Sequence, residues 1–177
     1  MLMRASTSEQ MGVGQDAVAG DNRAGINGRI MLVEDHGRSA ERITETLAAE
    51  QTIETVSDPQ QALIELPESH YDLLIVSLSL SGTDGLRLCS QVRSLDRTRH
   101  LPILIITEPG DDSRLLRGLE MGVNDYIVRP IDKNEMLARV RTQIKRKRYS
   151  DQLRNKLEES VEMALTDSLT GLYNRRY

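Results

Sequence analysis

Aromatic residues and cysteine are scarce in this chain. Its 177 residues include five Tyr and one Cys, but no Trp and no Phe. The single cysteine, Cys89, excludes an intramolecular disulfide and favours a reducing compartment such as the cytoplasm. The hydrophobic core therefore has to be built from Leu, Ile and Val, which is typical of buried parallel strands covered by helices.

Long apolar runs and an excess of positive charge are absent as well. No segment approaches the length of a membrane span, and the N-terminus lacks the basic-then-apolar layout of a signal peptide. The formal net charge is −4, which gives no general case for nucleic acid or an anionic membrane as a partner. These features favour a cytoplasmic globular protein.

The composition changes abruptly near residue 29. Residues 1–28 are rich in Gly, Ala, Ser and Asn without apolar periodicity, so we predict a flexible inter-domain linker there. Beyond them, five short apolar stretches alternate with amphipathic helical patterns. The apolar stretches lie at residues 30–33, 53–56, 73–76, 103–106 and 126–128. This alternation predicts an α/β domain over residues 29–145, with a five-stranded parallel sheet between helices.

The last helical pattern is unusually long. It starts at Asn134 and continues without Gly or Pro to about Leu165. We predict a capping box formed by Asp132 and Glu135 at its start. Residues 146–165 are predicted to form a linker helix that projects from the domain and can pair with another copy. The basic run 145–148 is interpreted as a solvated helix face and not as a nucleic-acid or lipid contact.

Polar residues follow the predicted strands at their carboxyl ends, where the functional crevice of a parallel α/β sheet lies. They are Glu34, Asp35, Ser77, Thr107 and Arg129. With the turn at Asp84 and Gly85, this set strongly resembles the receiver-domain family of response regulators in two-component phosphorelay signal transduction. The resemblance covers about residues 29–145 and implies a flavodoxin-like, doubly wound fold.

Receivers of this family phosphorylate themselves on an aspartate that ends the third strand. By resemblance, Glu34 and Asp35 take the positions of the acidic pair that holds Mg²⁺. Thr107 takes the hydroxyl position, and Arg129 takes the position of a lysine before proline. The acceptor position holds Ser77, whose hydroxyl has no low-energy path to an acyl phosphate and removes one of the three metal-binding carboxylates.

We therefore predict a degenerate receiver, or pseudo-receiver, with no catalytic residue of its own. We expect no firm cofactor and at most a weak Mg²⁺ site at Glu34 and Asp35. Arg129 is expected to pair with one of these carboxylates in place of a phosphoryl group. Tyr126 matches the family's switch aromatic, although we favour a half-buried strand tyrosine. His36 is assigned no metal role.

The C-terminal residues resemble the opening motif of GGDEF domains, which make cyclic di-GMP from two GTP. The matching residues are Asp167, Leu169, Thr170, Asn174, Arg175 and Arg176. We therefore expect residues 166–177 to be the opening segment of a truncated GGDEF domain, as in diguanylate cyclases of the PleD type. The GGDEF signature itself is missing, so we expect no enzyme in the chain as it stands, whereas its parent would be a diguanylate cyclase.

The leading hypothesis is a non-phosphorylatable adaptor for dimerisation and signal transmission in a response regulator of the diguanylate cyclase type. Its expected partners are a first receiver domain and a GGDEF domain of the same or a partner chain, in a homodimer. We place the contact on the last helix, with Arg139 and Arg141, the last strand and the helix before it. The alternatives are an active phospho-receiver with an unorthodox acceptor and a free-standing protein that binds receivers.

Overall fold

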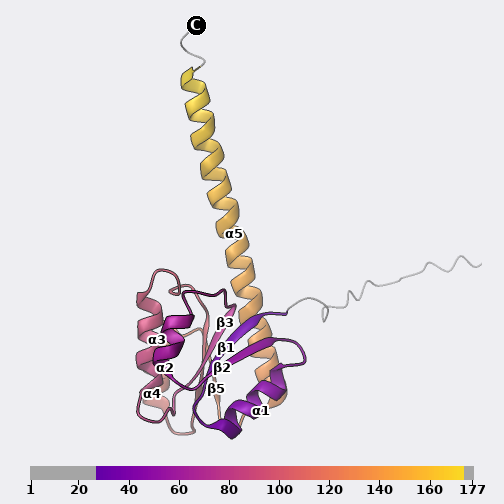
Figure 1. Cartoon of the computed structure of the whole chain (residues 1–177), viewed down its shortest axis with the longest axis vertical. Coiled ribbons are helices and arrows are strands. Elements are labelled where there is room, and N and C mark those ends of the chain that lie inside the picture. Colours follow the sequence, from indigo (N-terminus) through magenta and orange to yellow (C-terminus); the bar gives the residue numbers. More distant parts are fainter. Residues whose placement is uncertain (1–26, 174–177) are drawn as a thin grey trace, which may run out of the picture.

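The computed structural model describes residues 27–173, which form a parallel sheet between helices and one long projecting helix (Figure 1). The strands are β1 (Arg29–Val33), β2 (Thr52–Val56), β3 (Leu73–Ser77), β4 (Ile103–Thr107) and β5 (Asp125–Val128). The helices are α1 (Gly37–Leu47), α2 (Pro59–Glu65), α3 (Gly85–Ser94), α4 (Asp112–Glu120) and α5 (Lys133–Tyr173). The strand order is β2-β1-β3-β4-β5 and every pairing is parallel, which confirms the predicted doubly wound fold.

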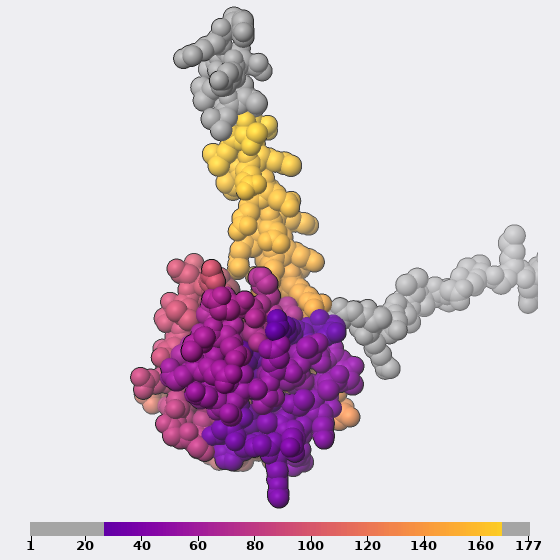
Figure 2. Space-filling model, viewed as in Figure 1, coloured from indigo at the N-terminus to yellow at the C-terminus, as the bar shows by residue number. Residues whose placement is uncertain are grey.

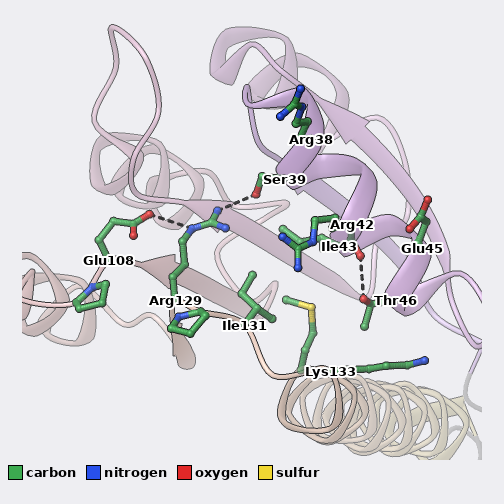
Figure 3. Close-up of a pocket in the computed structure, with 13 residues that line it drawn as sticks. Arg38, Ser39, Arg42, Ile43, Glu45, Thr46, Glu108, Arg129, Ile131 and Lys133 are labelled. Carbon is green, nitrogen blue, oxygen red and sulfur yellow. Dashed lines mark hydrogen bonds and ion pairs between the residues drawn. The ribbon is translucent and has the colours of Figure 1, made fainter.

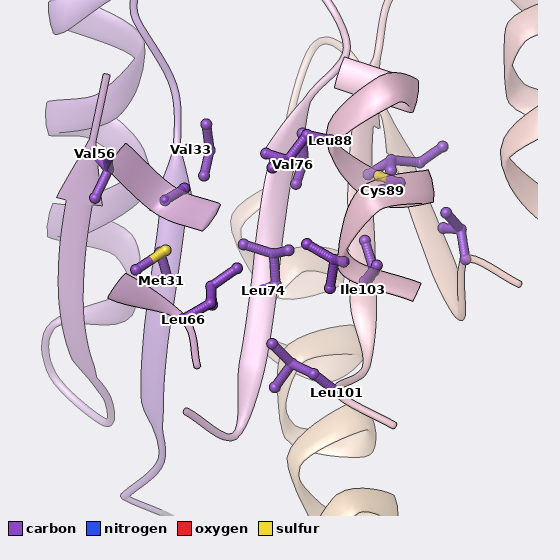
Figure 4. Close-up of a cluster of buried hydrophobic side chains, with 14 of the residues drawn as sticks. Met31, Val33, Val56, Leu66, Leu74, Val76, Leu88, Cys89, Leu101 and Ile103 are labelled. Carbon is purple, nitrogen blue, oxygen red and sulfur yellow. The ribbon is translucent and has the colours of Figure 1, made fainter. Parts of the chain in front are cut away.

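The sheet has a hydrophobic core on each face, because successive strand residues point to opposite sides. Met31, Leu74 and Ile103 belong to the core under α2 and α3, which also holds the buried thiol of Cys89 (Figure 4). On the other face, β-strand residues pack with side chains of α1 and α5. This second core includes Ile30, Leu32, Ile75, Ile43, Leu47, Val140 and Ile144. Both faces of the central strands are thus covered, as their continuous apolar sequences predict.

Short-range hydrogen bonds fix the starts of several helices. The Asp58 carboxylate accepts from the Gln60 amide at 2.9 Å, with Pro59 as the first residue of α2. Asp132 accepts from the Glu135 amide at 2.8 Å, which confirms half of the predicted capping box. The Glu135 side chain does not reach back, since it accepts from Arg139 one turn later at 2.9 Å.

Helix α5 is longer than its sequence pattern indicated. It was expected to end near Leu165, but the helical backbone continues to Tyr173. Its first turns bury Met136, Val140 and Ile144, and its second half stands clear of the domain (Figure 2). Among the described residues, no helix is both long enough and apolar enough to cross a membrane.

The point where α5 leaves the domain is held by Arg148. Its guanidinium donates to the Asn27 carbonyl at 2.6 Å and lies 3.9 Å from the Asp72 carboxylate. Within the basic run, Lys147 pairs along α5 with Asp151 at 2.5 Å, and Arg148 contacts the domain besides facing solvent. These contacts tie the first described residues of the chain to the projecting helix.

Candidate functional site

The carboxyl ends of β1, β3, β4 and β5 bring the residues singled out in the sequence to one edge of the sheet. In the register, Val33 lies opposite Val76, Ser77 opposite Ile106, and Thr107 opposite Val128. Because the strands are parallel and in step, Ser77 and Thr107 lie at the same edge as the residues that follow β1 and β5.

Glu34 is the most deeply buried charge of this edge, with a side chain that is 0% exposed. One carboxylate oxygen accepts from Arg129 Nη2 at 2.8 Å and from the Ser39 hydroxyl at 2.9 Å. The other accepts from the His36 amide at 3.0 Å. A buried carboxylate needs an opposite charge and hydrogen-bond donors. Arg129 supplies the charge, which confirms that it pairs with one residue of the acidic pair.

The Arg129 guanidinium joins four segments of the chain. Besides Glu34, its Nη2 lies 2.9 Å from the Ser39 hydroxyl in α1, and its Nε lies 3.0 Å from the Glu108 carboxylate after β4 (Figure 3). The peptide bond from Arg129 to Pro130 is cis. Neither Ser39 nor Glu108 was among the site residues expected from the sequence. The only available signal was that Glu108 directly follows Thr107.

Asp35 has one satisfied and one unsatisfied carboxylate oxygen. Its Oδ2 accepts from the Ser81 amide at 2.5 Å, whereas its Oδ1 is buried without a hydrogen bond. The His36 ring nitrogen lies 2.9 Å from Oδ1, an ion-pair distance without hydrogen-bond geometry. Burial raises the pKa of Asp35, but the Ser81 amide and the nearby His36 outweigh it and hold the pKa below its ordinary value.

Ser77 and Thr107 are the last residues of the two central strands. Ser77 is 1% exposed and Thr107 is 2% exposed. The Thr107 hydroxyl has no hydrogen-bond partner within residues 27–173. Gly85 approaches the Ser77 carbonyl so closely that a Cβ on this glycine would lie 2.6 Å from the carbonyl oxygen. The acceptor position therefore holds a buried hydroxyl where the family has a carboxylate.

The acidic pair has to be tested as a metal site. Glu34, Asp35 and His36 each place one ligand atom within 4.8 Å of the others. Magnesium prefers octahedral oxygen ligands and commonly takes carboxylates. Here Arg129 occupies one oxygen of Glu34, the His36 ring lies against both carboxylates, and Ser77 brings no charge. This set does not fit a tightly bound magnesium ion.

Tyr126 and Arg139 lie together on β5 and α5. Tyr126 is half-buried, and the Arg139 guanidinium carbon lies 5.7 Å from the centre of its ring. Arg139 also donates to Asp125 at 2.6 Å. Arg141 points to the other side of α5, where it pairs with Glu50 after α1. Placing both arginines on the face of α4, β5 and α5 is therefore wrong for Arg141, because residues two apart on a helix diverge.

The C-terminal motif is described only in part. Asp167, Leu169 and Thr170 lie in the last turns of α5, so this part of the motif is helical. Asn174, Arg175 and Arg176 lie outside the described residues.

Comparison with known proteins gives a consistent picture. Residues 30–141 match the family described as the response regulator receiver domain. The chain is 45% identical to the response regulator PleD of Caulobacter vibrioides over all 177 residues, which cover 38% of that protein. It is 35% identical over 119 residues to the phosphate regulon transcriptional regulatory protein PhoB of Rhizobium meliloti, covering 67% of this chain and 52% of that protein.

The solved structures agree. A response regulator of Chloroflexus aurantiacus is 32% identical with a TM-score of 0.64, over 67% of this chain and 98% of that one. The chain thus spans well under two thirds of the length of both PleD and PhoB, but almost the whole length of the Chloroflexus aurantiacus chain.

Proposed function

This chain belongs to the response regulator receiver family, and we propose that it is a member that accepts no phosphoryl group. In this proposal it acts as an adaptor for dimerisation and signal transmission. Its parent is a two-component response regulator of the diguanylate cyclase type, and the signal it passes on controls the synthesis of cyclic di-GMP.

The observation that carries the proposal is the arrangement of Ser77, Glu34 and Arg129. An acyl phosphate requires a carboxylate nucleophile, and the charge that develops on a phosphoryl group requires cations placed to neutralise it. Ser77 supplies no carboxylate, and it is enclosed in the sheet. The cation nearest the acidic pair, Arg129, is already bound to Glu34, Ser39 and Glu108. Arg129 is thus held by carboxylates of the chain itself, without a phosphoryl group.

The projecting half of α5 supports dimerisation. Tyr149, Leu153, Leu157 and Val161 recur at every fourth position, and all four are exposed, Leu157 by 67%. Neighbouring charges of both signs, such as Arg154 and Glu158, accompany this stripe. A stripe of this kind is stabilised when a second helix covers it, and the matching occupant is the same helix of another copy.

A second exposed apolar area supports a receiver as partner. It lies on α4 and β5 and includes Leu116, Leu119 and Val128, which are 59%, 41% and 39% exposed. Next to it are the charged pair of Arg139 with Asp125 and the half-buried Tyr126. An apolar centre with a charged margin is the usual make-up of a protein interface. We assign this face to the first receiver domain.

The link to cyclic di-GMP rests on the sequence. The similarity to PleD extends through α5 to the last residue of this chain, and the C-terminal motif resembles the opening of a GGDEF domain. In this proposal α5 connects the receiver to that domain, so that pairing of two α5 helices sets the distance between two output domains.

Phosphorylation is tested by the intact mass of the chain after incubation with acetyl phosphate and Mg²⁺. We expect no phosphoryl adduct on the native chain. The variant Ser77→Asp combined with Arg129→Lys restores the family's acceptor and its lysine, and serves as the positive control. A stable adduct on the native chain would overturn the adaptor proposal and favour an unorthodox acceptor.

Dimerisation is tested separately by sedimentation velocity. We expect the native chain to self-associate and the variant Leu153→Asp with Leu157→Asp to be monomeric. Ile64→Asp is the matched control, because Ile64 is 71% exposed on α2, outside the proposed interfaces. Equal association of all three proteins would show that α5 does not pair.

A further inference from the structure

A cavity lies beside the degenerate site, between α1 and the connection from β5 to α5 (Figure 3). Its volume is about 680 Å³. Small-molecule sites in proteins commonly have volumes of about 300–1,000 Å³. The cavity does not include Ser77, Asp35 or Thr107, so it is distinct from the position of a phosphorylated aspartate.

The charge of this cavity is positive although the chain as a whole carries a net charge of −4. Four cationic side chains line it, Arg38, Arg42, Arg129 and Lys133, against the two carboxylates of Glu45 and Glu108. Glu108 is already paired with Arg129 at 3.0 Å. Positive charge concentrated in a hollow attracts anionic ligands more strongly than charge spread over a convex surface.

The charges of Arg42 and Lys133 are not paired within the described part of the chain. Within residues 27–173, neither side chain forms a hydrogen bond or an ion pair, in contrast to Arg129, Arg139 and Arg141. Figure 3 shows the Arg42 side chain projecting from α1 over the space that Ile131 faces from the other side. A guanidinium in such a position can bind a phosphate through two N–H donors and can also stack on a flat ring.

The floor of the cavity is apolar. Ile43 of α1 is 3% exposed and Met136 of α5 is 0% exposed, and half-buried Ile131 lies between them in the chain connection. Pro109 and Pro130 complete the apolar part of the lining. Because Ile43 and Met136 are closed to solvent, the apolar surface that a ligand can reach is that of Ile131, Pro109 and Pro130, and an inorganic anion would leave this part of the lining in contact with water. A ligand that uses the whole cavity therefore carries an anionic group on an organic body.

We propose that this cavity binds an organic phosphate, with the phosphate group held by Arg42 and Lys133 and a flat organic body lying on Ile131, Pro109 and Pro130. Arg129 lines both this cavity and the degenerate site. Binding therefore acts on the end of β5 and the first turn of α5, which gives the receiver a non-covalent input. Only this last consequence rests on the proposed adaptor function, since the binding itself does not depend on it.

The test is isothermal titration calorimetry of the native 177-residue chain with four probes. They are adenosine 5′-monophosphate, phenyl phosphate, adenosine and inorganic phosphate. We expect saturable binding of at least one organic phosphate at one site per chain. Adenosine and inorganic phosphate are each expected to bind at least about tenfold more weakly. Adenosine lacks the phosphate group, and inorganic phosphate lacks the organic body.

Variants locate the binding. Arg42→Ala and Lys133→Ala are each expected to weaken the organic phosphate about tenfold, the loss typical of one charge-assisted contact. Arg87→Ala is the control, because Arg87 is exposed on α3, away from the cavity. Circular dichroism verifies that all three variants are folded. Both substituted positions on the cavity are exposed on helices, where alanine is well tolerated.

Three results would overturn the inference. They are no saturable binding of either organic phosphate, binding of inorganic phosphate as tight as that of the organic probes, and affinities unchanged in both Arg42→Ala and Lys133→Ala. The intact-mass experiment on Ser77 is independent of all three. A phosphoryl adduct there would refute the adaptor and leave this binding site standing, and the reverse also holds.

Discussion

Replacing Arg129 by methionine removes the guanidinium that binds the buried carboxylate of Glu34, while keeping most of the side-chain volume. Breaking a buried ion pair by removing one partner costs about 3–5 kcal/mol of folding free energy. Two features reduce that cost here. The Arg129 side chain is 24% exposed, and the Ser39 hydroxyl and the His36 amide still donate to Glu34. We therefore expect a loss of about 2–3 kcal/mol.

The assay is urea denaturation followed by circular dichroism for the native chain, Arg129→Met, Glu34→Gln and the double variant. The double-mutant cycle is expected to give a coupling of about 2 kcal/mol, because each single change leaves the other group without its charge partner. The slope of the unfolding free energy against urea concentration is expected to be the same in all four proteins. Arg38→Met serves as the control, since Arg38 is exposed on α1 and does not contact Glu34.

Magnesium adds a second readout to this series. If the guanidinium keeps the ion away, adding Mg²⁺ stabilises Arg129→Met but leaves the native chain unchanged, because a ligand stabilises only the state that binds it. A stability of Arg129→Met within about 0.5 kcal/mol of the native value, together with a coupling near zero, would refute the reasoning that the pair holds this edge of the sheet together.

Two further predictions concern packing and pH. Gly85→Ala is expected to destabilise the fold by about 1–3 kcal/mol in urea denaturation, because the new Cβ would lie 2.6 Å from the Ser77 carbonyl oxygen and 3.1 Å from the Leu78 Cα. Gly37→Ala, with nothing within 4 Å of its Cβ, is the control, and equal stability of the two variants would contradict the close approach. Burial and the hydrogen bond to Glu54 raise the pKa of Tyr71 to about 12. The folded state holds the Tyr71 proton more tightly than the unfolded state does. The resulting stabilisation is therefore complete below pH 10, and about 2 kcal/mol of folding free energy is lost between pH 10 and 12. Tyr71→Phe should remove that part of the pH dependence, and an unchanged profile in the variant would count against it.

The layers of the domain follow from the amino-acid sequence alone. Continuous apolar stretches such as Leu73 to Val76 have to be buried on both faces. Their alternation with amphipathic helices predicts a parallel sheet with helices on both sides. Local chemistry also accounts for the start of α2, where Asp58 provides a side-chain acceptor and Pro59 a fixed φ. The strand-end rule led to Glu34, Ser77 and Arg129, because parallel strands present their carboxyl ends at one edge whatever the details of packing.

Tertiary structure decided which partner each charge takes. The sequence left Arg129 a choice between two carboxylates, and only the fold brings its guanidinium to Glu34, Ser39 and Glu108 together. Likewise, Arg139 and Arg141 look equivalent in sequence, yet the orientation of α5 sends one to β5 and the other to Glu50.

The cavity, too, could not be predicted from the sequence. Its walls come from α1 and from the start of α5, which are about ninety residues apart in the chain. Each wall taken alone is an ordinary amphipathic helix face or a short connection. The unpaired charge of Arg42 and the apolar side chain of Ile131 become one site only when the sheet holds α1 and the start of α5 on the same face. A cavity is a property of packed surfaces and leaves no periodic signal in the chain.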